Sequence, residues 1–167
     1  MPTTLVVVFF ISAHFCADFL YTNFAVKWGG QMQVTLIKNT DTTATLAYRI
    51  ARTVYAQSGA SSLVGVMALT SMIKNLSNKT GRGISDIVND ANIFPVLNPE
   101  HQYHTRLYDN ANTRSFQMCV RVALRMLKNV LDDYCYGATM FHPSNTLPSW
   151  AVSRGYIADI DDMLFYL

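Results

Sequence analysis

Apolar residues recur at helical spacing in three stretches of the chain. In the first stretch, Leu46, Ile50 and Val54 lie four residues apart, so they share one face of a helix that we expect to end at Gly59. A second stripe after that glycine predicts another helix, because its members follow the i, i+3, i+7 rule. These members are Val66, Leu69, Ile73 and Leu76. The clearest stripe predicts a helix over residues 113–131 and consists of Phe116, Val120, Ala123, Leu127 and Val130.

The starts of the first two helices are predicted from side chains that can accept hydrogen bonds from the free N–H groups of a first turn. Thr40 or Asp41 can cap the first helix, and Ser61 or Ser62 can cap the second. The first helix is therefore expected to begin soon after residue 41, and the second to begin just after the stop at Gly59.

Shorter elements are expected outside these helices. The run Leu5–Ile11 is rich in β-branched and aromatic residues, which predicts a buried strand or an arm for assembly contacts. The run is too short to span a bilayer, and no Lys or Arg precedes Lys27, which disfavours a cleaved signal peptide. Residues 31–37 alternate and predict a further strand, residues 84–90 predict a short helix, and residues 164–166 predict a closing strand.

Composition and charge limit the classes of function. The chain has 167 residues, of which 50% are hydrophobic and 14% are charged, so it suits a domain with a substantial core. A net charge of +2 is too small to indicate nucleic-acid binding. The three cysteines are unevenly placed, and only a Cys119–Cys135 bridge in an oxidising compartment is considered. Small buried hydrophobic side chains are the ordinary interpretation of such cysteines.

No metal or cofactor is expected. His101 and His104 are three residues apart with Glu100 adjacent, but the sequence offers no third or fourth ligand near them. We therefore interpret the two histidines as exposed loop residues.

Two motifs lie on the predicted elements. The first consists of Ala51, Arg52, Thr53 and Tyr55, followed by Gly65, Ala68 and Asn75. The second consists of Gly137–His142, Pro148 and Trp150, with a closing Phe165-Tyr166. In this order and at this separation the motifs resemble the SleB-type (spore-cortex-lytic) cell-wall hydrolases, over roughly residues 46 to 167. The resemblance implies cleavage of peptidoglycan glycan strands on a lysozyme-like, mostly helical fold.

Pattern and resemblance together give an expected architecture. The fold class is mostly α (α+β), a lysozyme/lytic-transglycosylase-like helical domain with a few short strands. Residues 41–167 are assigned to this SleB-like domain, and residues 1–40 to an N-terminal extension or arm. The resemblance suggests a virion or phage-tail component, or a protein exported to the cell wall. No transmembrane segment is expected.

The resemblance also implies which residues form the site. Gln57 stands eleven residues beyond Leu46, close to three helical turns, and therefore on the same inward face. It occupies the position of the family's catalytic glutamate, Ser61 occupies that of a second glutamate, and Met140 replaces the first of two histidines. The expected substrate-binding residues are Tyr55, Ser61, Asn75, Phe94, Thr139 and His142. For Asn75 and His142, a structural role in fixing backbone or loop is the alternative.

The change at the catalytic position alters the expected activity. Breaking a glycosidic bond requires a proton for the leaving oxygen, and a glutamine has none to give near neutral pH. Losing such acid–base help costs on the order of 10²–10⁴ in rate. Three explanations stay open: Gln57 is an engineered substitution, a displaced acid such as Asp133 serves instead, or a hydrolase fold has degenerated and is kept for binding or assembly. The third is our working hypothesis, and an active hydrolase or lytic transglycosylase is the alternative.

The predicted partners are peptidoglycan glycan strands and proteins of an assembly. Arg114, Arg121, Arg125 and Lys128 follow one another at intervals of seven, four and three residues, so they share one face of the third helix. Such a face is ordinarily solvated, and it can also meet an acidic protein or an anionic wall polymer. The N-terminal arm is a second candidate for assembly contacts.

Overall fold

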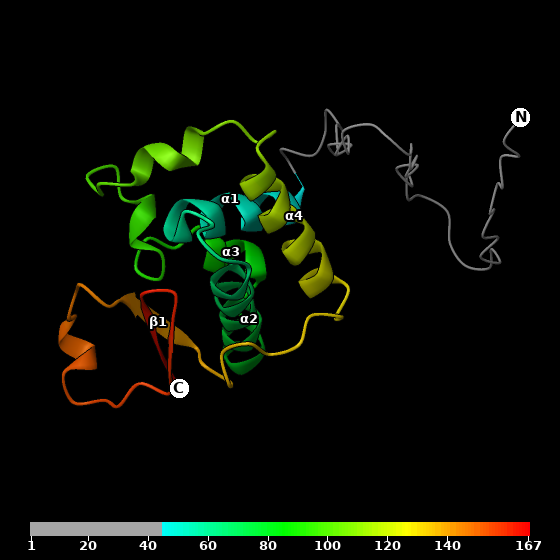
Figure 1. The fold of residues 1–167 in the computed structure, drawn as a ribbon. Coiled ribbons are helices and arrows are strands. Elements are labelled where there is room, and N and C mark those ends of the chain that lie inside the picture. Colours follow the sequence, from blue (N-terminus) through cyan, green and yellow to red (C-terminus); the bar gives the residue numbers. More distant parts are fainter. Residues whose placement is uncertain (1–44) are drawn as a thin grey trace, which may run out of the picture. The chain divides into compact units, whose positions relative to one another are not determined.

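A computed structural model describes residues 45–167 of the chain (Figure 1). Helices α1 (Leu46–Ser58), α2 (Leu63–Thr80) and α3 (Ile84–Val88) come first, and α4 (Arg114–Leu127) follows a long loop. The loop contains the short 3-10 helices η2 (Pro95–Leu97) and η3 (His104–Tyr108). The predicted arm, the run Leu5–Ile11 and the strand over residues 31–37 lie outside the described residues.

The C-terminal part forms a small sheet. Strands β1 (Met140–Pro143), β2 (Ala158–Ile160) and β3 (Met163–Tyr166) are antiparallel in the order β1-β3-β2, and η4 (Ser149–Ala151) lies between the first two. The mostly helical α+β class predicted from the sequence is therefore confirmed for residues 45–167. The predicted closing strand is confirmed as β3.

Caps explain where the helices begin and end. The side chain of Ser62 accepts a hydrogen bond from the N–H of Gly65 (2.9 Å), so one of the two predicted caps of α2 is confirmed. The predicted caps of α1 were wrong, because Thr45 holds that position and accepts from the N–H of Tyr48 (3.3 Å). The predicted stop at Gly59 is confirmed, since this residue adopts the left-handed φ of 65° that ends a helix.

Helix α4 is shorter than its sequence pattern predicted. It ends at Leu127, and Asn129 then takes a left-handed φ of 56°. This turn carries Val130 out of the apolar stripe, and its side chain is 58% exposed instead of buried. The apolar spacing of the sequence therefore extends beyond the point where the helix ends. Asparagine adopts a left-handed backbone conformation more readily than most residues, so the chain can turn here.

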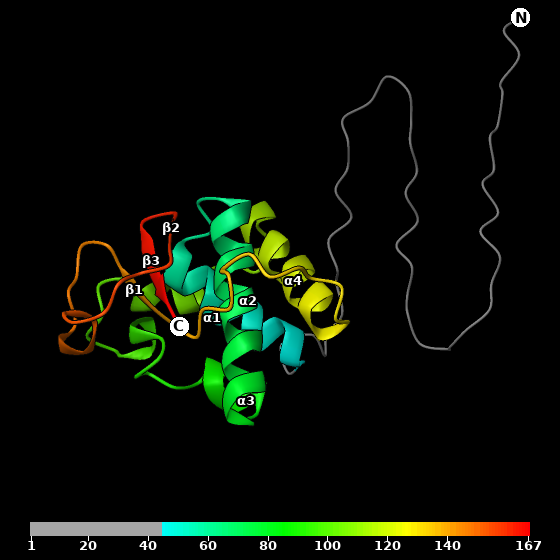
Figure 2. The same ribbon diagram turned by 90° about the horizontal axis from the view of Figure 1, so that it is seen from below.

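Helix α1 is the central element of the helical part. It contacts α2, α3 and α4 as well as η2 and η3, and Figures 1 and 2 show these elements gathered around it. Its Ile50 and Val54 are buried, and the largest fully buried rings are Phe94, Phe116 and Phe165. These rings come from the loop, from α4 and from β3, so one continuous core joins the helices, the loop and the sheet.

The sheet meets the helices at the turn between β2 and β3. Its two central residues, Asp161 and Asp162, have φ values of 55° and 59°, as a two-residue turn of type I′ requires. Asp161 lies directly on Gly65 of α2: a β-carbon added to this glycine would come within 2.8 Å of the β-carbon of Asp161. Gly65 is thus the residue that lets the hairpin approach the helix.

This close approach gives a prediction for stability. Gly65→Ala is expected to lower the free energy of unfolding by about 1–3 kcal/mol through overpacking, although alanine in a helix interior normally stabilises by up to about 1 kcal/mol. Urea unfolding measures the effect. Gly155→Ala is the matched control, because an added β-carbon there meets no atom within 4 Å. Adding Asp161→Gly should rescue Gly65→Ala, and equal stability of Gly65→Ala and the natural chain would contradict the contact.

Candidate functional site

Gln57 lies in the last turn of α1 with its side chain turned into the protein. Only 9% of the residue is exposed. Its Oε1 atom accepts a long hydrogen bond from the backbone N–H of Val96 in η2 (3.4 Å). The amide nitrogen of Gln57 has no hydrogen-bond partner within residues 45–167. The loop over residues 94–97 therefore covers the amide group. The oxygen of this group is hydrogen-bonded within residues 45–167, and its nitrogen is not.

The end of α1 is fixed by a second contact with the same long loop. The Tyr55 hydroxyl donates to the carboxylate of Asp109 (3.1 Å), just after η3. Partial burial, and then this hydrogen bond to Asp109, raise the pKa of Tyr55. The guanidinium of Arg106 lies against Gly59, where an added β-carbon would be 2.9 Å from Nη1. Tyr55 thus anchors η3 to α1 at the turn beside Gln57.

Arg52 belongs to the same anchor. Its guanidinium lies 4.3 Å from the ring centre of Phe116, and it donates to the carbonyl oxygen of Asp109 (2.7 Å) and to the hydroxyl of Tyr48 (2.6 Å). A cation stacked on aromatic rings and bonded to backbone joins α1, α4 and the loop. This accounts for the arginine of the first motif by packing alone.

Ser61 contacts an acid that sequence reasoning missed. Its hydroxyl donates to Oδ2 of Asp161 at 2.6 Å, across one hundred positions of sequence. The carboxylate is half-buried and stands beside the first turn of α2. Asp161 lies in an acidic run over residues 159–162, but nothing in the sequence pattern links that run to Ser61.

Asn75 belongs to a separate cluster near the other end of α2. Its amide nitrogen lies 3.2 Å from Oδ1 of Asp133 and 3.4 Å from Sγ of Cys135. The Asp133 carboxylate also accepts from the backbone N–H groups of Cys135 and Gly137. Burial acts to raise the pKa of Asp133, but these donors outweigh it and hold the pKa below its usual range. Asp133 is therefore a poor proton donor, and Asn75 here holds the loop that enters the second motif.

Phe94, Thr139 and His142 are buried in the region of the sheet. The ring of Phe94 packs on that of Phe141 with centres 5.6 Å apart, and the N–H of Thr139 donates to the carbonyl of Tyr166 (2.8 Å). These contacts make both residues part of the joint between the loop, β1 and β3.

Both ring nitrogens of His142 are engaged. Nδ1 lies 2.8 Å from the carbonyl oxygen of Pro143, which can only accept, so this nitrogen carries a proton. Nε2 lies 2.9 Å from the hydroxyl of Tyr166, and it accepts from this hydroxyl when Nδ1 carries the single ring proton. The ring is also flanked by Trp150 and Tyr166, and His142 is only 4% exposed. In this arrangement the imidazole orients the strands and offers no free nitrogen to a ligand.

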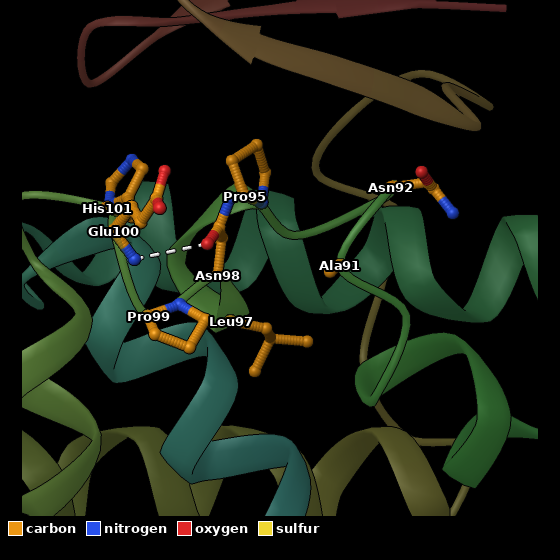
Figure 3. Close-up of a pocket in the computed structure, with 8 residues that line it drawn as sticks. All are labelled: Ala91, Asn92, Pro95, Leu97, Asn98, Pro99, Glu100 and His101. Atoms are coloured by element: carbon orange, nitrogen blue, oxygen red, sulfur yellow. Dashed lines mark hydrogen bonds between the residues drawn. The ribbon is translucent and has the colours of Figure 1, made fainter.

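The two cavities described for residues 45–167 lie elsewhere. The larger, about 490 Å³, is formed by the loop over residues 91–101 (Figure 3). Its lining consists of Ala91, Asn92, Pro95, Leu97, Asn98, Pro99, Glu100 and His101. The smaller, about 270 Å³, is lined by residues of α1 and of the adjoining loops, among them Arg49, Arg52 and Thr53. None of the seven predicted site residues lines either cavity.

The larger cavity is nevertheless connected to Gln57 by the short segment over residues 95–97. Pro95 and Leu97 line it, and the N–H of Val96 between them bonds Gln57. Glu100 is the single glutamate of the chain and is exposed at this cavity. Nδ1 of His101 accepts from the N–H of Tyr103 (3.2 Å), and burial, with Arg106 and His104 adding to it, lowers the pKa of His101. The cavity thus presents a free carboxylate beside a histidine that favours the neutral form.

Neither a metal centre nor reactive thiols are found in this part of the chain. Among residues 45–167 no three His, Cys, Asp or Glu side chains are grouped to hold a metal ion, and no helix is long and apolar enough to cross a membrane. Cys119 and Cys135 are buried and free, so no bridge joins them. Burial raises the pKa of Cys119 to about 12 and also raises that of Cys135, which suppresses the nucleophilic thiolate.

Comparison of the chain with protein-family models, with curated proteins and with solved structures finds no match.

The pKa of Asp133 gives a prediction for pH dependence. The pKa of Asp133 is lower in the folded protein than its unfolded value of about 4. The ionised carboxylate therefore stabilises the fold fully above the unfolded pKa, and this stabilisation is lost as pH falls through the folded pKa. Asp133→Asn should therefore lower the free energy of unfolding by about 1 kcal/mol near pH 7, and the difference from the natural chain should shrink in acid.

Urea unfolding at a series of pH values measures this difference. Asp132→Asn is the matched control, since its exposed side chain makes no hydrogen bond within residues 45–167. A pH-independent difference for Asp133→Asn would show that the charge of the carboxylate contributes nothing.

Proposed function

We propose that this chain carries a lysozyme-like domain of the SleB type that binds peptidoglycan glycan strands without cleaving them. The observation that carries the proposal is the amide of Gln57, at the end of α1, where the resemblance expects the catalytic glutamate. A virion or tail component, or an exported wall protein, is the setting that the resemblance suggests. The sequence motifs support this assignment, and the helical α+β architecture is compatible with it.

The surroundings of Gln57 would also accommodate an acid. A carboxyl group in its place would still accept from Val96, and its burial would raise its pKa, as a proton donor requires. The amide keeps the hydrogen bond but supplies no proton. The Val96 hydrogen bond and the burial of residue 57 therefore support the proposal that an acid was replaced here while its surroundings were kept.

Glycan binding is supported by the neighbouring cavity. Asn92, Asn98, Glu100 and His101 surround it with hydrogen-bonding groups, while Pro95 and Leu97 contribute apolar faces. Polar groups that fix orientation within an apolar lining are typical of ligand sites. The hydroxyl groups of a sugar ring can bond the polar side chains, and its C–H faces can pack on the apolar ones. We therefore propose that this cavity holds part of a glycan strand, and that the strand continues past the segment over residues 94–97 to Gln57.

The proposal predicts the outcome of a single substitution. The natural chain should bind purified peptidoglycan without lowering the turbidity of a wall suspension. Gln57→Glu should bind equally well and should gain lytic activity by a factor on the order of 10² or more, because it restores a proton donor at a buried position. Pull-down with insoluble peptidoglycan and turbidity loss measure the two properties.

Gln102→Glu is the matched control, because it adds the same charge at an exposed position of the same loop. It should bind and should not lyse. Glu100→Gln tests the cavity and should weaken binding in both the natural and the Gln57→Glu backgrounds. Failure of the natural chain and of Gln57→Glu alike to bind peptidoglycan would overturn the proposal and favour a purely structural subunit.

An active hydrolase that uses a displaced acid is the second candidate, and one contact favours it. Asp161 bonds Ser61, and the resemblance expects a carboxylate at the position of Ser61. The turn between β2 and β3 therefore places an acid beside Ser61, in the turn before α2 where the resemblance expects a glutamate. In this alternative Asp161, and not Asp133, supplies the chemistry.

This alternative is tested by Asp161→Asn. If the natural chain lyses cell walls, Asp161→Asn should lower the rate on the order of 10²–10⁴-fold. Asp159→Asn, a change to an exposed residue of the same hairpin, should leave the rate unchanged. Lysis by the natural chain that survives Asp161→Asn would exclude Asp161 as the displaced acid.

A further inference from the structure

Helix α4 has two chemically distinct faces. Its inner face contributes Phe116, Val120 and Met126 to the core, and the helix lies along α1 and α2 (Figure 1). Its outer face carries Arg114, Arg121 and Arg125, all exposed, and Lys128 follows at the end of the helix. We refer to the three arginines as the arginine row.

The arginine row is not neutralised by the described part of the protein. Helix α4 contains no Asp or Glu, and the ion pair found within residues 45–167 is Arg82–Asp90, which lies elsewhere. Arg125 donates to the carbonyl oxygen of Val130 at 3.4 Å, which occupies only one of its N–H groups. Arg52, in contrast, is stacked on a ring and bonded to backbone. The arginines of the row therefore differ from Arg52, whose contacts stabilise the fold.

The placement of the row is unfavourable for the isolated helix. Arg121 and Arg125 are i and i+4, a like-charge pair that destabilises a helix by about 0.2–0.5 kcal/mol. Arg114 is the first residue of α4, where the helix dipole disfavours a positive charge. Only Arg125 lies at the end that favours a cation. Helix stability thus does not explain the row, whereas an external anion would relieve both costs.

The geometry suits an extended anionic chain. With a rise of about 1.5 Å per residue, Arg114 and Arg121 stand about 10 Å apart along the axis and Arg121 and Arg125 about 6 Å apart. Guanidinium groups bind phosphate through paired N–H donors. The row therefore fits a linear polymer with repeated phosphate groups better than a single compact anion.

The absence of stacking partners separates polyol phosphates from nucleic acids. The exposed residues of α4 are its arginines and Ser115, so α4 itself presents no aromatic ring beside the charges. Proteins that bind single-stranded nucleic acid add such rings to stack the bases. We propose that the arginine row binds a linear polyol-phosphate polymer. This site is separate from Gln57 and from the cavity at residues 91–101, so it goes beyond the proposed function.

The experiment uses the full chain and a synthetic poly(glycerol phosphate) oligomer labelled for fluorescence anisotropy. Binding should weaken steeply between about 50 and 200 mM salt, as counterion release requires. The triple variant Arg114→Gln, Arg121→Gln, Arg125→Gln should bind at least about ten-fold more weakly. A plot of log affinity against log salt concentration should also be less steep for this variant. Its slope should decrease in magnitude by about 2, because each of the three lost phosphate contacts contributes about 0.7. Replacing the same residues by lysine should preserve most of the salt dependence.

The matched control removes three charges from other elements. Arg49→Gln, Lys79→Gln and Arg154→Gln together give the same net charge from exposed positions outside α4, and should leave the affinity within about two-fold of the natural chain. Circular dichroism melts establish that all variants are folded. Equal weakening in the control would overturn the proposed site, as would no binding at low salt. Equal or tighter binding of a single-stranded oligonucleotide of the same charge would overturn the choice of a polyol phosphate.

Discussion

The described structure depends on the burial of helix α1 on nearly all sides. Helices α2, α3 and α4 and the loop with η2 and η3 all contact it, so its side chains are fixed by neighbours from distant parts of the sequence. A polar group at the inner end of such a helix must be bonded or reached by solvent, because an unpaired buried polar group is costly. Gln57 meets this demand with one bond from Val96 and a small exposed area. The loop conformation over residues 94–97 and the identity of residue 57 are therefore coupled.

This coupling bears on the proposal that residue 57 has lost an acid. A glutamate and a glutamine both accept from Val96, and they differ little in volume, so the exchange leaves the packing of α1, η2 and Phe94 intact. The chemistry changes far more than the fold, since only the acid can deliver a proton.

The elements that the sequence predicted are those whose causes are local. Helical period and caps act within a few residues, which is why α1 with its stop at Gly59, α2 with Ser62 and the inward side of Gln57 could be read in advance. The left-handed turn at Asn129, which ends the apolar stripe before Val130, depends on one backbone reversal that the period does not record. The contact of Ser61 with Asp161 depends on how the β2–β3 turn meets α2, one hundred residues away. Hydrophobic periodicity does not record this contact. The glycine at position 65, which permits the close approach, is a local sign of it in the sequence.

The same distinction applies to the site. Side-chain chemistry at His142 suggested equally a ligand contact or an orienting role, and only the neighbours in space separate the two. Tyr166 and the carbonyl of Pro143 take both ring nitrogens, and Trp150 closes one side. Asp133 is likewise defined by the N–H groups that surround it, which lower its pKa and make it an acceptor. By contrast, Asp161 bonds a single serine at the junction of sheet and helix. The hydrogen-bonding state of each of these groups is therefore decided by residues distant in the sequence, and not by the motif residues alone.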